Sequence, residues 1–479
     1  MADADGNALK QELSVVDAAA FSAGLIGPVG AMALLGTGAA PILGRAVTWA
    51  FIFALVGVSL VAYCFIRMSR HISHTGSVYA LVGTTLGPQA GFFAGWALLG
   101  AYVGIAIGSG IEIALFFTQF LNLTGISNTH EWIVIALISL ALIGLLAFAE
   151  IKVITRTLLF SELTGIVLVT ILSIVIIVTL ILGDGPHGRS FNLQFLSFEP
   201  GTGFSLISKA ALYGFLAFAG FEGAAALGEE TANPKREIPR AIRVALTVVG
   251  VFYILTIIGQ SIGYGSTAAD TKAFTSGLPY GDLAQVYVDK ALADVLNLAA
   301  TISLFAICLA TSAGAARILF ALSRDGTGKR TGLASLSKRG APVVALMIVL
   351  LVVLGGMIGQ QLAHVGVVNA TFYALQLGTL CILVAYLMAT IGAIKFLFFD
   401  GKVQTPRWQI VIPALGAVFV GYTLVKNVVG ESFPYNRFPI VVGIYLVIGL
   451  AVVLFTPGIA GRVRNGLLSS SSDPLVDSA

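Results

Sequence analysis

The sequence predicts an all-helical integral membrane protein with twelve membrane-spanning helices. Of its 479 residues, 57% are hydrophobic and only 10% are charged, whereas a soluble domain carries about a quarter charged residues. Apolar runs of the roughly 20 residues that a helix needs to cross a bilayer recur along the whole chain. So few charges cannot cover a water-facing surface, and the lipid bilayer is the expected solvent.

The apolar runs define the twelve expected spans in order. These are residues 14–40, 45–67, 88–120, 131–149, 158–183, 204–230, 241–265, 283–323, 341–362, 366–399, 408–427 and 437–457. The third, eighth and tenth exceed the thickness of a bilayer, so we expect them to tilt or to extend beyond it. Residues 1–13 and 458–479 are the expected terminal tails.

The Lys and Arg residues indicate the orientation. Of the 27 in the chain, 20 fall on the side of the two tails and seven on the other side. Because positive charge is retained in the cytoplasm, both termini are expected there, in a multi-pass protein of the cell membrane. The first 13 residues are polar and do not resemble a signal peptide.

No metal or cofactor is expected. The three cysteines, Cys64, Cys308 and Cys381, lie inside apolar runs with neither a disulfide framework nor zinc-ligand spacing. The five histidines form no metal-binding pattern. No lysine follows a glycine loop in the manner of a phosphate-binding site, and no nucleic-acid partner is expected.

The first span contains an expected interruption. Residues 24–30 include three glycines and Pro28, and a proline lacks the N–H donor and clashes with the preceding turn. We therefore expect the helix to break near Gly27. The sixth span carries a similar glycine break at Gly220 and Gly223, about 193 residues later.

The two breaks occupy corresponding positions in two five-helix blocks, residues 14–183 and 204–399, which residues 408–457 follow with two more helices. Interrupted helices at matched positions indicate a transporter binding site. Unpaired peptide groups are tolerated in a membrane only where protein or a wet cavity surrounds them. The alternative is that both breaks are packing kinks.

The exposed peptide groups predict a zwitterionic ligand. A half-helix N-terminus attracts a carboxylate, and the candidate donors are the amides of Val29, Gly30 and Ala31. Carbonyls attract an ammonium, and the candidates are those of Phe218 and Ala219. Three further residues flank the breaks and complete the expected binding site, namely Ile26, Gly27 and Gly220.

Three aromatic residues, Phe215, Phe218 and Phe221, recur every three residues near the second break. They fit an aromatic lid over a substrate, or ordinary packing against lipid and neighbouring helices. For the stripe as a whole packing is favoured; beside the break, Phe218 and Phe221 are favoured as lining residues.

Three blocks carry a family resemblance. GFEGAAALGEETANPKREIPRAI resembles the helix 6–7 signature of the amino acid–polyamine–organocation (APC) permeases, through Gly220, Phe221, Glu222, Glu229, Glu230, Asn233, Pro234, Arg236, Ile238, Pro239 and Ile242. HTGSVYALVGTTLGPQAGFFAGW resembles their loop 2–3 and helix 3, and ARILFALSRDG the end of their helix 8. The matching residues there are Gly76, Tyr79, Gly87 and Trp96, then Arg317, Ala321, Arg324, Asp325 and Gly326.

The resemblance implies a LeuT-like fold of two inverted five-helix repeats with helices 1 and 6 interrupted, plus two extra helices. It also implies uptake of an amino acid or related amine by alternating access, with the substrate backbone held at both breaks. One departure is visible. The usual G-[ST]-G of the first break is replaced by Gly27-Pro28-Val29-Gly30, which lacks the hydroxyl and one donor.

Three carboxylates lie inside the expected spans: Glu112, Glu162 and Glu222. A charge in mid-bilayer costs at least about 2.5 kcal/mol, so such groups face a cavity or are protonated, as suits a proton carrier. The resemblance suggests ion coupling for Glu162, because proton-coupled members place an ionisable group near the first break from this helix. The alternative is that Glu162 is a vestibule carboxylate near the cytoplasmic end, paired with Arg156 or Lys152. Glu222 is expected to cap the second half-helix, and Glu112 has no assigned role.

Two features support other interpretations. Adjacent hydroxyls at Thr311 and Ser312 match a sodium site in relatives of this fold, since hard cations favour oxygen ligands, but small residues also pack helices closely. Charges after the second break predict a cytoplasmic gate or anchor. In this gate Glu229 and Glu230 face Lys235 and Arg236, and Pro234 and Pro239 stiffen the turn. The other expected structural or gate residues are Asn233, Arg317, Arg324 and Asp325.

A proton-coupled importer of a neutral amino acid is the leading functional hypothesis. A sodium-coupled symporter and an amino acid or amine exchanger are alternatives of the same fold. Other classes fit less well. A channel predicts flux without saturation, a receptor needs a sizeable soluble domain, and a membrane enzyme needs clustered His, Asp or Cys, whereas this sequence offers neither such a domain nor such a cluster.

Overall fold

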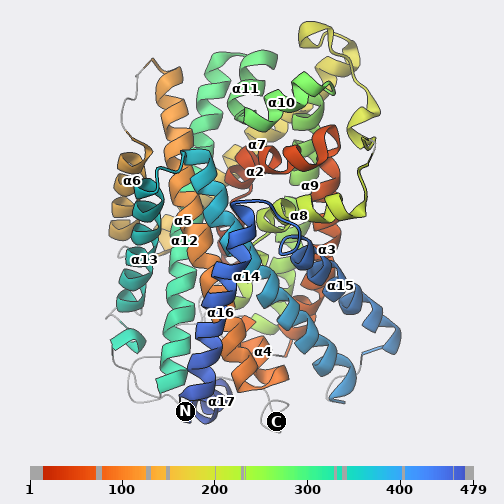
Figure 1. Ribbon diagram of the computed structural model, residues 1–479. Coiled ribbons are helices and arrows are strands. Elements are labelled where there is room, and N and C mark those ends of the chain that lie inside the picture. The colour runs from red at the N-terminus through yellow and green to blue at the C-terminus, as the bar shows by residue number, and fades with distance from the viewer. Residues whose placement is uncertain are drawn as a thin grey trace.

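The protein is a bundle of long helices (Figure 1). The computed structural model describes residues 15–71, 78–125, 131–146, 151–199, 201–227, 231, 233–327, 332–336, 342–401, 405–456 and 458–469. No β-strand occurs within these ranges. The long helices are α3 (Thr48–Met68), α5 (Pro88–Leu123), α7 (Ile151–Leu182), α9 (Pro234–Tyr264), α12 (Lys290–Thr327), α13 (Val343–Leu362), α14 (Val367–Ile394), α15 (Val411–Lys426) and α16 (Phe438–Phe455).

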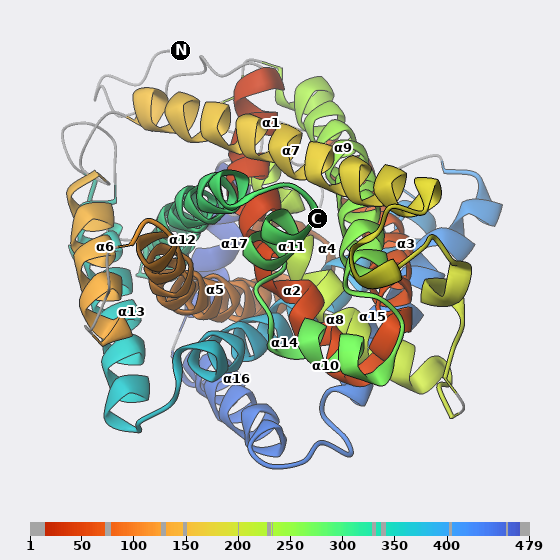
Figure 2. The same ribbon diagram turned by 90° about the horizontal axis from the view of Figure 1, so that it is seen from above.

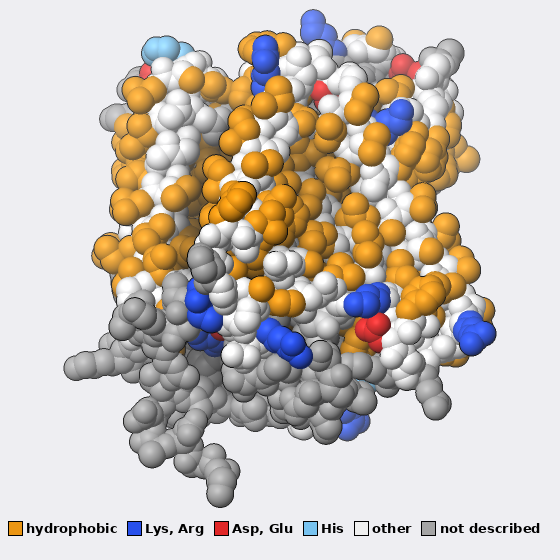
Figure 3. Space-filling model, turned by 60° about the horizontal axis from the view of Figure 1, so that its bottom comes forward, with side chains coloured by type: hydrophobic (Ala, Val, Ile, Leu, Met, Phe, Trp, Pro, Cys, Tyr) orange, Lys and Arg blue, Asp and Glu red, His pale blue; other side chains and the backbone are white. Residues whose placement is uncertain are grey.

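The membrane assignment agrees with these helices. Ten segments of the described chain are long and apolar enough to cross a membrane. Two shorter apolar helices, α6 (Trp132–Leu146) and α8 (Phe204–Ala217), lie at the expected fourth and sixth spans. Figure 3 shows hydrophobic side chains over much of the visible surface, with Lys and Arg toward its upper and lower margins, as expected for a lipid-facing exterior.

Four short helices were not anticipated: α4 (Val78–Leu86), α10 (Ala268–Ser276), α11 (Pro279–Tyr287) and α17 (Ile459–Ser469). In Figure 1, α10 and α11 lie at the upper end of the bundle, and α4 and α17 at the lower end. The expected start of the eighth span at residue 283 is therefore wrong, because residues 283–287 belong to α11. The seventh span also starts earlier than expected, since Pro234 takes the first helical position of α9, where the missing N–H costs nothing.

Close backbone contacts join the central helices. A Cβ atom on Gly104 of α5 would lie 2.7 Å from the Cα of Gly378 of α14, so only glycines permit this approach. Figure 2 shows α12 and α14 beside α5, and α6 with α13 at one edge of the bundle. This core supports one side of the interrupted helices described below.

Polar contacts connect the segments at the upper end of the helix bundle. Arg189 donates to Asp270 at 2.7 Å and to the carbonyl oxygen of Gly263 at 3.0 Å. Thr267 and Asp270 form a capping box at the start of α10. Tyr264 donates to Asp282 of α11 at 2.7 Å. The segment after α7 is thereby tied to α9 and α10.

Replacing Asp270 by asparagine is expected to lower stability by less than about 1 kcal/mol, because the ion pair is partly exposed. Desolvation by burial opposes ionisation of Asp270, but the hydrogen bonds from Thr267 and Arg189 outweigh it and hold the carboxyl pKa below its usual 3.8. The stabilisation is therefore complete above about pH 4 and is lost as the pH falls further. Thermal unfolding of both proteins at pH 7 and pH 3 tests this: the difference in Tm should be present at pH 7 and shrink at pH 3.

Candidate functional site

The first span is interrupted where expected. Helix α1 (Val15–Ile26) and helix α2 (Pro28–Leu43) are separated by Gly27, whose φ of 52° and ψ of 64° are left-handed. The Gly27 N–H donates to the Ala23 carbonyl at 2.8 Å and completes α1. Pro28 then starts α2 without a donor. A methyl group at Gly27 would overlap Ile307 of α12, so the turn needs glycine for both its conformation and its space.

Each predicted amide donor of α2 has a partner within the protein. The Val29 N–H donates to Glu162 Oε1 of α7 at 2.8 Å, and the Gly30 N–H donates to Ser303 Oγ of α12 at 2.9 Å. The Ala31 N–H donates to the Gly27 carbonyl at 2.9 Å. A carboxylate therefore does lie at this helix N-terminus, as the dipole favours, but it belongs to Glu162.

The carbonyl groups at the end of α1 lack their usual helical donors. Residue 28 is a proline, and the amides of residues 29 and 30 are bonded to side chains, so the oxygens of Gly24, Leu25 and Ile26 receive no N–H from the next turn. By contrast, the Val29 carbonyl accepts from Tyr280 of α11 at 2.9 Å. The first break thus presents free acceptors, whereas its amide donors are occupied.

The sixth span is interrupted as well. Helix α8 ends at Ala217, and the short helix η4 (Phe221–Leu227) follows Gly220, whose φ is 99°. The Phe218 carbonyl accepts from the Phe221 N–H at 3.3 Å. The Ala217 carbonyl accepts from Tyr253 of α9 at 2.7 Å. Among the described residues the Ala219 carbonyl has no recorded partner, so it is the better of the two predicted acceptors.

The two breaks touch each other. A Cβ atom on Gly220 would lie 3.0 Å from the carbonyl carbon of Leu25 and 3.1 Å from the nitrogen of Ile26. Nearby, the Ser22 hydroxyl accepts from the Ala224 N–H at 2.8 Å and lies 3.4 Å from the Phe221 carbonyl. Glycine at position 220 thus allows the backbone of the second break to meet the end of α1.

The three phenylalanines are fully buried against neighbouring helices. Phe218 packs edge-on against Tyr253, with ring centroids 4.9 Å apart. Phe221 packs against Phe65 of α3 and Tyr386 of α14, at 5.4 and 5.3 Å. Phe215 points toward Gly57 of α3. These contacts are those of helix packing, and a role as a lid stays a prediction.

Glu222 is bound by two tyrosines from other helices. Tyr102 of α5 donates to its Oε1 at 2.9 Å, and Tyr386 donates to its Oε2 at 2.6 Å. The carboxylate therefore ties η4 to α5 and α14. Neither tyrosine was predicted from the sequence, since both sit in uniformly apolar runs without a distinguishing pattern.

Helix α12 reaches the first break through Ser303 and Ile307. The Thr311 hydroxyl instead donates to the Ile307 carbonyl of its own helix at 2.6 Å, and Ser312 is the next residue along. Ser303, about two turns before that pair, accepts from the Gly30 N–H of the first break, and a sodium site at Thr311 and Ser312 stays a prediction. Within the described residues no group of three His, Cys, Asp or Glu side chains could hold a metal ion.

Only some of the predicted gate residues are among those that the structure describes. Glu229 and Glu230 fall outside the described residues. The Asn233 carbonyl accepts from the amides of Arg236 and Glu237 at 3.1 and 2.9 Å, so this segment is the first turn of α9 rather than a loop. In helix α12, Arg317 is half-buried. At the end of that helix, Asp325 accepts from Tyr79 of α4 at 2.8 Å and from Arg324 at 2.7 Å.

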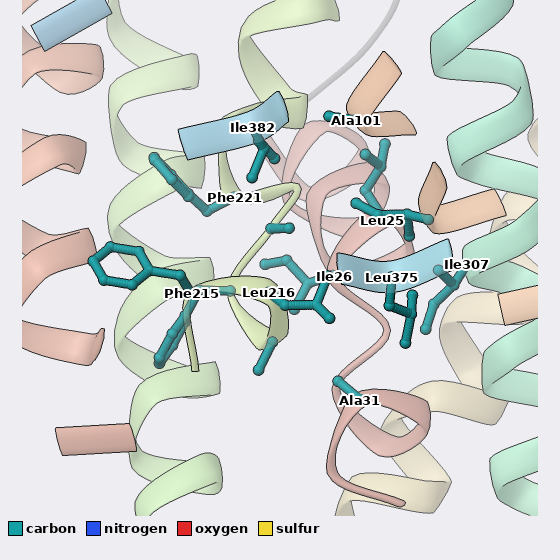
Figure 4. Close-up of a cluster of buried hydrophobic side chains, with 14 of the residues drawn as sticks. Leu25, Ile26, Ala31, Ala101, Phe215, Leu216, Phe221, Ile307, Leu375 and Ile382 are labelled. Atoms are coloured by element: carbon teal, nitrogen blue, oxygen red, sulfur yellow. The ribbon is translucent and has the colours of Figure 1, made fainter. Parts of the chain in front are cut away.

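Apolar side chains surround the contact between the breaks (Figure 4). They are buried and come from five helices: Leu25 and Ile26 of α1, Ala101 of α5, Leu216 of α8, Ile307 of α12, and Leu375 and Ile382 of α14. Glu112 is also buried in α5, and its Oε1 has no partner among the described residues. The structure thus combines backbone polar groups with an apolar wall.

Comparisons with known proteins agree with this arrangement. A protein-family model described as "Amino acid permease" matches residues 13–453. The branched-chain amino acid permease BcaP of Bacillus subtilis (strain 168) is 25% identical over 330 residues, which are 66% of this chain and 68% of the relative. An uncharacterized transporter of Mycobacterium tuberculosis (strain ATCC 25618 / H37Rv) is 32% identical over 146 residues, 30% of this chain and 29% of the relative. The aromatic amino acid transport protein AroP of Escherichia coli (strain K12) is 30% identical over 137 residues, 28% of each chain.

Proposed function

Because this chain belongs to the amino acid permease family, we propose that it is a secondary active transporter that imports an amino acid across the cell membrane by alternating access. The observation that carries the proposal is the contact of Gly220 with the backbone of Leu25 and Ile26. It brings the two helix interruptions together, and interrupted helices at matched positions point to a transporter binding site. In this proposal the five-helix blocks are inverted repeats, and both termini are cytoplasmic.

The proposed substrate is a neutral amino acid with an apolar side chain. The carbonyls of Gly24, Leu25, Ile26 and Ala219 are suited to an ammonium group, and the surrounding side chains are aliphatic or aromatic. The buried carboxylates of Glu162 and Glu222 are already hydrogen-bonded within the protein. The names of the Bacillus and Escherichia relatives refer to branched-chain and aromatic amino acids, which agrees with an apolar substrate.

The proposed driving ion is the proton, and Glu162 is the proposed carrier. This carboxylate is buried, lies on a predicted span, and binds the peptide group next to the first break. Protonation of Glu162 would directly change its hydrogen bond to the Val29 N–H, and this peptide group belongs to the backbone that is proposed to receive the substrate. Sodium symport and amino acid exchange remain the alternatives, and they are separated by the experiment below.

Uptake of radiolabelled L-leucine into proteoliposomes tests this function. We expect saturable uptake that an inward proton gradient stimulates several-fold and that an inward sodium gradient leaves unchanged. Stimulation by sodium alone would support the symporter alternative, and uptake that requires preloaded leucine would support exchange. If none of the twenty amino acids competes with leucine or is itself taken up, the proposal is wrong.

A further inference from the structure

All amide donors in the first turn of α2 are occupied in this structure. Pro28 has no N–H, and the amides of Val29, Gly30 and Ala31 donate to Glu162, Ser303 and the Gly27 carbonyl. A substrate carboxylate at this helix N-terminus therefore finds no free donor. It must displace one of the present acceptors.

Glu162 is the acceptor that most resembles such a substrate. Its carboxylate oxygen lies 2.8 Å from the Val29 nitrogen, at the end of a helix where negative charge is favoured. The side chain belongs to α7 and is only 3% exposed. Two carboxylates close together in a buried site cannot both stay ionised without a large cost.

We propose that Glu162 is a built-in competitor for the substrate carboxylate: ionised, it occupies the Val29 amide, and protonated, it releases that amide to the substrate. The inference rests on the proposed function, and it specifies how the proton and the amino acid are coupled. Each substrate carboxylate that binds α2 requires one proton on Glu162.

The exchange balances in charge. A proton adds to the Glu162 carboxylate, which becomes a neutral carboxyl and a poorer acceptor, because hydrogen bonds to ionised groups are about twice as strong. The Val29 N–H then turns to the substrate carboxylate. One negative charge leaves the helix N-terminus and one arrives. On the other side of the membrane Glu162 loses its proton, regains the amide and expels the carboxylate.

The groups around Glu162 allow this titration without another ionic partner in the described contacts. Tyr253 of α9 and Tyr280 of α11 are the titratable groups that face it, and Ser303 of α12, like Glu162, accepts from the first turn of α2. The described side chains of α1 and α2 add no titratable group. Tyr280 also donates to the Val29 carbonyl. Glu162 therefore binds the N–H group of Val29, and Tyr280 binds its carbonyl group.

The test compares L-leucine with 3-methylbutylamine, which is leucine without its carboxylate, by equilibrium binding to the purified full chain between pH 5.5 and 8.5. In the wild type the leucine Kd should rise with pH, by up to about tenfold per pH unit. Any binding of the amine should not follow this trend. In Glu162→Gln the leucine Kd should be constant, because glutamine cannot ionise. Glu112→Gln, a change to another buried carboxylate on α5, is the matched control and should keep the wild-type trend.

Several outcomes would overturn the inference. One is a Glu162→Gln protein whose leucine Kd keeps the wild-type dependence on pH. Another is a Kd for 3-methylbutylamine that depends on pH as the leucine Kd does, or that is lower than the leucine Kd. Either result would mean that the carboxylate of leucine does not bind the amides of α2. The wild-type comparison decides the matter even if the variant fails to fold. Leucine uptake with a pH-independent Kd would refute only the competition, whereas absence of all amino acid uptake would refute the proposed function.

Discussion

Alanine in place of Gly220 is expected to abolish most transport and to destabilise the protein by at least about 2 kcal/mol. The φ of 99° at this position is one that side chains rarely adopt, and such strain costs about 1–3 kcal/mol. The added methyl would also lie 2.9 Å from Leu25 Cβ and 3.0 Å from its carbonyl carbon. Because one neighbour is backbone, α1 itself must move, and the two breaks would separate. Leucine uptake and thermal unfolding in detergent measure both effects.

Two matched glycines separate the causes of this effect. Gly201 also has a positive φ, of 90°, but a Cβ there meets nothing within 4 Å, so Gly201→Ala reports the strain alone. Gly24 has open space around it without a positive φ, and Gly24→Ala should be nearly neutral for stability. Wild-type uptake by Gly220→Ala would mean that the contact between the breaks has no part in transport.

The interruptions could be predicted from sequence because they have local causes. Pro28 removes a donor wherever it stands in a helix, and glycine supplies the left-handed turn at Gly27 and the positive φ at Gly220. Most helix positions were predictable for a similar reason, since lipid-facing and buried surfaces of a span are both apolar. The short helices α4, α10 and α11 were missed for another reason, because they do not have the length of a span.

The partners of the breaks could not be predicted, because they depend on how distant helices align. Ser303 contacts Gly30, from 273 positions away, and nothing in the local sequence distinguishes it from other small residues of α12. The predicted pair Thr311 and Ser312 lies about two turns further along α12, or about 12 Å along the axis, and its role as an ion site stays a prediction. Tyr102, Tyr253, Tyr280 and Tyr386 were missed likewise, because the role of each is set by the distant peptide oxygen or carboxylate that it meets.

Replacing Glu222 by alanine is expected to be the most destabilising change to a single polar side chain at the site, by about 3–5 kcal/mol. The buried hydroxyls of Tyr102 and Tyr386 would lose their acceptor, and an unsatisfied buried polar group costs about 1–3 kcal/mol. Tyr386→Phe removes only one donor from the carboxylate and should cost less, about 1.5–3 kcal/mol. The free energies of unfolding in detergent, from denaturant or thermal curves, give both values.

A double-mutant cycle shows whether the contact itself is responsible. Once Glu222 is alanine, the Tyr386 hydroxyl has no carboxylate to bind, so Tyr386→Phe in that background should cost nothing or relieve an unpaired hydroxyl. The two effects should therefore fall short of additivity by at least about 1 kcal/mol. Tyr445→Phe is the control, because that hydroxyl donates to the Trp96 carbonyl at 2.8 Å and not to Glu222; its cost should be the same in both backgrounds. Additive effects of Glu222→Ala and Tyr386→Phe would contradict a carboxylate that joins η4 to α14.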